Sequence, residues 1–136
     1  MDAPVLVRSG TELGEAELPS GPAEVVWYDF TSAPGEGRTA VYVGLPEFLG
    51  QPAVFGQLNT LENGDLIEVV TQNRRAFAYR VTRNYVVSAN MPSGYLYSTR
   101  LRTESVRLFT YTGETSARGF ALLVVIDAVI VQDRDE

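Results

Sequence analysis

Residues 106–114 read Val-Arg-Leu-Phe-Thr-Tyr-Thr-Gly-Glu, an apolar and β-branched run that stops at a glycine. Such side chains favour extended backbone, and a glycine interrupts a strand. The stretch therefore predicts a strand over 105–112 that ends in a loop over 113–119. A longer strand is predicted over 120–132. Its continuously apolar part, 121–126, is typical of a central buried strand.

Similar runs recur along the chain with turn residues between them. They predict further strands over 5–7, 24–28, 38–44, 65–72, 76–83 and 85–87, the last continuing its predecessor past a bend. Between residues 46 and 64 the spacing of Phe55, Leu58 and Leu61 predicts one or two helical turns instead. Some eight short strands predict an all-β domain, and closure into a barrel would remove the exposed sheet edges.

Composition limits the partners. With 136 residues the chain is expected to be one domain, 1–136. A net charge of -6 argues against nucleic acid as a partner. The apolar run that ends at Asp127 is shorter than the roughly 20 residues of a membrane span, so no membrane segment is expected. No signal-peptide pattern opens the sequence, and the abrupt start Met1-Asp2-Ala3-Pro4 suggests a domain excised from a longer exported or anchored protein.

The sequence contains no cysteine and no histidine. Side chains of this chain therefore supply neither a thiolate nucleophile nor an imidazole base. The acidic residues Glu62, Asp65 and Glu68 lack the regular spacing of a calcium loop. No metal and no cofactor are expected.

Short segments over nearly the full length resemble the sortase family in their order and spacing. Sortases are the transpeptidases that join surface proteins to the bacterial cell wall. The matching segments are 2–5, 26–28, 34–36, 39–41, 43–44, 52–55, 64–69, 107–110 and 113–114. Together they look most similar to the actinobacterial-type sortases, classes E and F. The resemblance implies a closed eight-stranded β-barrel with one or two short helices, at the bacterial cell surface or the extracellular face of the membrane.

In that family a histidine follows the Val-Gly pair, a cysteine follows the end of the Leu-x-Thr strand, and an arginine begins the last strand. The resemblance places Leu45, Tyr111 and Ala121 at these positions, with Arg118 as the other candidate for the arginine. Because none of the three keeps the family's chemistry, we expect a pseudosortase. Such a domain would not be an enzyme; it would bind a protein or peptide at the cell surface or have a structural role there.

Two alternatives remain open. Tyr111 could act as a nucleophile if its pKa were lowered from about 10, so an enzyme with a repurposed cleft is the competing hypothesis. Thr110, Thr112, Arg107 and Arg118 could contact a ligand. As strand residues and exposed arginines, however, these four are better explained by sheet structure and solvated charge.

Overall fold

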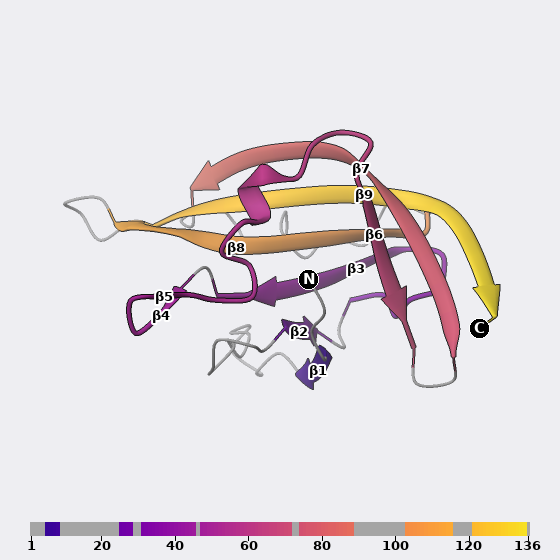
Figure 1. The fold of residues 1–136 in the computed structure, drawn as a ribbon. Helices are drawn as coiled ribbons and strands as arrows, with labels where there is room; N and C mark the ends of the chain where they lie inside the picture. Colours follow the sequence, from indigo (N-terminus) through magenta and orange to yellow (C-terminus); the bar gives the residue numbers. More distant parts are fainter. Residues whose placement is uncertain are drawn as a thin grey trace.

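The computed structural model describes residues 5–8, 25–28, 31–45, 47–71, 74–88, 103–115 and 121–135. This part of the chain is almost entirely strand (Figure 1). Seven strands form one sheet in the order β1-β2-β3-β8-β9-β7-β6, and β4 and β5 form a separate two-stranded sheet. The elements are β1 (Val5–Arg8), β2 (Val25–Tyr28), β3 (Thr39–Gly44), β4 (Glu47–Phe48), β5 (Gln51–Pro52), the 3-10 helix η1 (Leu58–Thr60), β6 (Leu66–Val70), β7 (Arg75–Ser88), β8 (Ser105–Thr115) and β9 (Ala121–Asp135).

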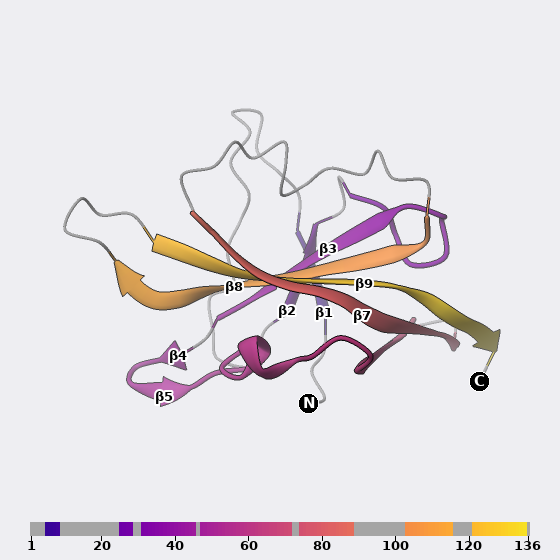
Figure 2. The same cartoon turned by 90° about the horizontal axis from the view of Figure 1, so that it is seen from above.

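The long strands β7 and β9 bend, so the sheet curls (Figures 1 and 2). Their antiparallel ladder shifts register between Ala78 and Tyr79 and again between Val81 and Arg83. Irregularities of this kind bend a strand and increase its twist. The curled sheet has the sortase β-barrel fold that was expected.

Hydrophobic side chains pack on both faces of the central strands. On the η1 face, which carries η1 and Phe55, the cluster includes Tyr42, Leu108 and Ile126. Figure 2 shows η1 and the β4–β5 hairpin on one side of the sheet. The opposite face, here called the Tyr28 face, has its own cluster: Val26, Tyr28, Val41, Val43, Phe109, Leu123 and Val125. Burial on both faces explains why β3 is a continuous apolar run instead of an alternating one.

The structure confirms the all-β prediction and the position of each predicted strand, with three differences. Residues 75–88 form one strand, β7, where the sequence suggested two pieces. β8 runs to Thr115, into the predicted loop 113–119. The short β4–β5 hairpin was not predicted, and the expected strand count of eight is approximate. The expected helix is the single 3-10 turn η1.

Across the residues that can be described, no helix has the length and apolar character needed to cross a membrane.

Candidate functional site

The C-terminal end of β3 is fastened to the middle of β8. These strands are parallel neighbours, with Tyr42 opposite Leu108 and Val43 opposite Phe109. One step further, the Thr110 hydroxyl donates a 2.7 Å hydrogen bond to the carbonyl oxygen of Gly44. Thr110 is only 3% exposed, so this bond satisfies a polar group that water cannot reach. The bond holds the last residue of β3 against β8, which continues to Thr115.

Gly44 is required by close packing at this point. A Cβ added to it would lie 2.8 Å from Phe55 Cδ2 and 2.9 Å from Val54 Cγ1. The next residue, Leu45, accepts a 3.0 Å hydrogen bond from the Phe55 amide through its carbonyl oxygen. The segment around Phe55 therefore holds the chain as it leaves β3.

Leu45 and Tyr111 follow these fastened residues directly. Extending the β3–β8 register two places beyond Val43 and Phe109 puts Leu45 beside Tyr111, and Tyr111 is opposite Leu123 in β9. The three residues thus form one row across adjacent strands at the same end of the sheet. Figure 1 shows the end of β3 and the β8–β9 hairpin on the same side of the molecule.

Ala121, the third position implied by the resemblance, begins β9. It pairs with Thr115, beyond a register shift that separates Thr115 from Tyr111 in the β8–β9 ladder. Because β3, β8 and β9 are consecutive in the sheet, Leu45 just after β3, Tyr111 within β8 and Ala121 at the start of β9 lie on three neighbouring strands. The backbone thus brings together the three sequence positions, and the role of their side chains stays a prediction.

The remaining candidate ligand contacts differ in their surroundings. The Thr110 hydroxyl already bonds Gly44. Arg107 Nε donates to Asp127 Oδ1 at 2.7 Å, and its side chain is 15% exposed. Thr112 lies in β8, and Arg118 lies outside the residues described. Ligand contact by these four residues stays a prediction.

A polar cluster on the Tyr28 face was not predicted. Asp127 accepts from Arg107 at Oδ1 and from the Tyr85 hydroxyl at Oδ2, the latter at 3.0 Å. Arg83 places a guanidinium nitrogen 3.9 Å from Asp127 Oδ2, and its Cζ lies 4.2 Å from the centroid of the Tyr85 ring. The available signal was Asp127 itself, because a charged residue is unusual directly after a buried apolar run.

A second carboxylate, that of Glu104, accepts hydrogen bonds at the opposite end of the sheet. Glu104 accepts from the Tyr79 hydroxyl at 2.6 Å and from the Gly37 amide at 2.8 Å. Burial raises the pKa of the Tyr42 phenol well above its ordinary value, and the negative charge of Glu104 makes a smaller contribution in the same direction. These contacts anchor the loop before β3 to β7.

The acidic residues do not gather into a metal site where the structure can be described. Within those ranges no three Asp or Glu side chains come close enough to hold an ion. Asp65, one of the acidic residues singled out in the sequence, instead accepts a 2.8 Å hydrogen bond from the Glu62 amide. It serves as a turn residue.

Residues 1–131 match the family model of the sortase domain. Among solved structures, sortase A of Listeria monocytogenes is 15% identical, with a TM-score of 0.72 over 97% of this chain and 81% of that one. Sortase E1 of Streptomyces coelicolor, solved with a tripeptide in its active site, is 20% identical, with a TM-score of 0.68 over 95% of this chain and 81% of that one. The sortase D5 transpeptidase of Clostridium perfringens is 17% identical, with a TM-score of 0.63 over 93% and 70%. No protein of curated function matches the chain.

These likenesses establish the fold, and the family match corrects one expectation. The prediction that the protein is not an enzyme is wrong, because sortases are cysteine transpeptidases and the family model spans nearly the whole chain. The prediction took the absence of cysteine and histidine as evidence against an enzyme family. The absence of cysteine and histidine limits only which side chains of this chain could act as a nucleophile or a base. With residues 1–131 matching the sortase domain, the chain belongs to the sortase family.

Proposed function

We propose that this sortase domain binds an extended peptide segment of a protein at the bacterial cell surface, at the place where the end of β3 is bonded to β8. Sortases act on protein substrates at the cell surface, which supports both the partner and the location. The observation that carries the proposal is the bond from Thr110 to Gly44, which sets Leu45 and Tyr111 side by side. A strand end bonded to its neighbouring strand gives a rigid base on which a peptide can be held.

Leu45, Tyr111 and Ala121 are proposed to occupy the positions of the family's histidine, cysteine and arginine. Support comes from the order of the sequence motifs and from the neighbouring positions of β3, β8 and β9 in the sheet. With leucine and tyrosine in two of these positions, recognition would rest on apolar and aromatic contact. The motif pattern also supports a place near the actinobacterial classes E and F, although the fold is equally similar to class A.

A second candidate is acyl transfer at the same place through a nucleophile other than cysteine. Membership of a transpeptidase family favours it. Tyr111 follows the family's strand end directly and carries a hydroxyl, which would need activation because a tyrosine pKa is ordinarily about 10. Since the chain has no thiol, any such activity would survive treatment with a thiol-alkylating reagent.

The test uses labelled Leu-Pro-Ala-Thr-Gly and Leu-Ala-Ala-Thr-Gly peptides and follows binding by fluorescence anisotropy. We expect saturable binding that the Tyr111→Ala variant weakens at least about tenfold, as removal of an aromatic contact residue often does. The control is Leu66→Ala, which shortens an exposed leucine on β6, remote from the site in the sheet order.

The same samples, given an amine acceptor, are examined by mass spectrometry. A ligated or cleaved product that is resistant to alkylation would support the second candidate. No binding by the parent protein, or equal loss in both variants, would contradict a peptide site at Tyr111.

A further inference from the structure

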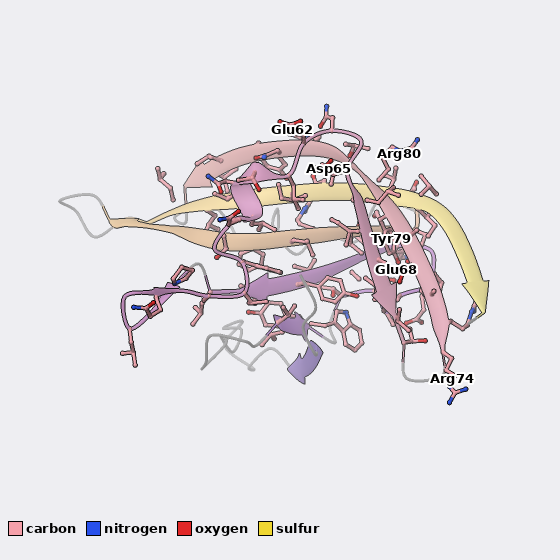
Figure 3. The ribbon with its side chains drawn as sticks, viewed as in Figure 1. Glu62, Asp65, Glu68, Arg74, Tyr79 and Arg80 are labelled. Carbon is pink, nitrogen blue, oxygen red and sulfur yellow. The ribbon has the colours of Figure 1, made fainter. Side chains whose placement is uncertain are left out.

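We propose that Arg83, stacked on Tyr85 on the Tyr28 face, is a binding site for the carboxylate group of a peptide. This site is distinct from the place where β3 ends on β8 and does not depend on the function proposed above. Arg83 and Tyr85 are on β7 and Asp127 is on β9, with Arg107 of β8 beside them. Figure 3 shows the described side chains from the viewpoint of Figure 1 and labels Arg80, which is on the same strand as Arg83.

The first argument is charge. Two guanidinium groups, from Arg83 and Arg107, share one carboxylate, from Asp127. Arg107 is the closer partner of that carboxylate, at 2.7 Å against 3.9 Å for Arg83. The positive charge of Arg83 is therefore only weakly offset by Asp127 and favours an anionic ligand at that place.

The second argument is how the contacts to Asp127 are divided. Arg107 takes the short contacts, 2.7 Å from Nε to Oδ1 and 3.4 Å from Nη2 to Oδ2. The Tyr85 hydroxyl bonds Oδ2 as well. The nitrogen of Arg83 is 3.9 Å from Oδ2, which is beyond hydrogen-bonding distance. Asp127 therefore attracts Arg83 without taking up the donors of its guanidinium group.

The third argument is orientation. The Arg83 side chain is 58% exposed, while its guanidinium carbon is held 4.2 Å from the centre of the Tyr85 ring. The ring is itself fixed through its hydroxyl at Asp127. A guanidinium group stacked on an aromatic face keeps the N–H donors at its edge available, and this planar fork matches the two oxygens of a carboxylate. Less side-chain freedom is then lost when the ligand binds.

The probes are short peptides titrated into the protein and followed by NMR at the Arg83 Nε–H and Tyr85 ring signals. One peptide is Ala-Ala-Glu-Ala-Ala with both ends blocked, its counterpart carries glutamine in place of glutamate, and a third carries glutamine and a free C-terminus. We expect saturable shifts with the glutamate peptide or with the free C-terminus, and none with the blocked glutamine peptide. Which of the two binds identifies the source of the carboxylate.

Variants separate the site from general charge attraction. Arg83→Gln should weaken binding about tenfold or more, as expected for loss of a charge-assisted hydrogen bond. Arg83→Lys keeps the charge but loses the fork, so it should restore only part of the affinity. Arg80→Gln, an equal charge change at an exposed position of the same strand, should leave affinity unchanged. Equal weakening by Arg80→Gln and Arg83→Gln, or no saturable shift with any carboxylate peptide, would overturn the proposal.

Discussion

At the scale of single residues, the hydroxyl of Thr110 matters more than its place in the motif suggests. As a β-branched residue at a strand end it is unremarkable in sequence. In the structure it is buried and bonds the carbonyl of Gly44 across to β3. Sequence could place Thr110 in a strand, but the partner of its hydroxyl lies 66 residues away and depends on the parallel β3–β8 register.

Thr110→Val should lower the free energy of unfolding by about 1–2 kcal/mol, because the shape is kept while a buried carbonyl loses its donor. Denaturant unfolding measures the change. The matched control is Thr60→Val, which removes an exposed hydroxyl bonded to the Gln57 carbonyl at 2.7 Å and should cost much less. Equal effects in the two variants would mean that the Gly44 bond does not hold the strand ends.

Tyr42 makes stability sensitive to alkaline pH. Burial and Glu104 raise the pKa of Tyr42 in the folded protein above its unfolded value of about 10. Above that pH the folded protein retains a proton that the unfolded chain has lost. The contribution of this residue to stability is therefore complete below about pH 10 and falls as the pH rises further, by at most about 1.4 kcal/mol per pH unit.

The expected result is a steeper loss of stability above about pH 10 in the parent protein than in Tyr42→Phe, which has no phenol to ionise. Unfolding curves at several alkaline pH values measure it, and identical slopes for the two proteins would refute the assignment to Tyr42.

At the scale of elements, the sequence of β9 predicted its central place in the sheet but not the contacts of Asp127. The apolar run 121–126 correctly predicted a central strand, since β9 lies between β8 and β7. Asp127 interrupts that run, and its partners Arg107, Tyr85 and Arg83 come from the two flanking strands. The local sequence pattern does not predict these contacts, because they form only when the three strands pair in the sheet. The β4–β5 hairpin was missed because strands of two residues leave no alternation to detect.

Asp127→Asn should destabilise the fold by about 2 kcal/mol, because Arg107 loses its charged partner in a largely buried setting. Denaturant unfolding again provides the measurement. Glu62→Gln, an equal charge change at an exposed residue, is the control and should have little effect. An Asp127→Asn protein as stable as the control variant would show that the cluster does not tie β7, β8 and β9 together.

At the scale of the whole molecule, the fold could be predicted because its signals are spread along the chain. The strand positions and the sortase-like order of motifs agree with the family match over residues 1–131. The agreement holds although the chain is only 15–20% identical to the solved sortases of Listeria monocytogenes, Clostridium perfringens and Streptomyces coelicolor. Burial patterns survive at such identities because many apolar residues can fill the same core. Activity could not be predicted in the same way, because it depends on a few side chains whose replacement leaves the fold intact.

The central claim is that the fold sets Leu45 beside Tyr111 where the end of β3 is bonded to β8, and disulfide trapping tests it directly. The chain has no cysteine, so a Leu45→Cys, Tyr111→Cys double variant would contain only the introduced pair. Neighbouring strands lie about 4.8 Å apart, within the Cα separation that a disulfide spans.

Mass spectrometry after mild oxidation of the folded protein should show an intramolecular disulfide in this variant. It should show no intramolecular disulfide in a control double variant, Tyr111→Cys with Leu66→Cys, because β6 is separated from β8 by β9 and β7. Free thiols that persist in the 45–111 pair, or crosslinking of both pairs to the same extent, would contradict the claim.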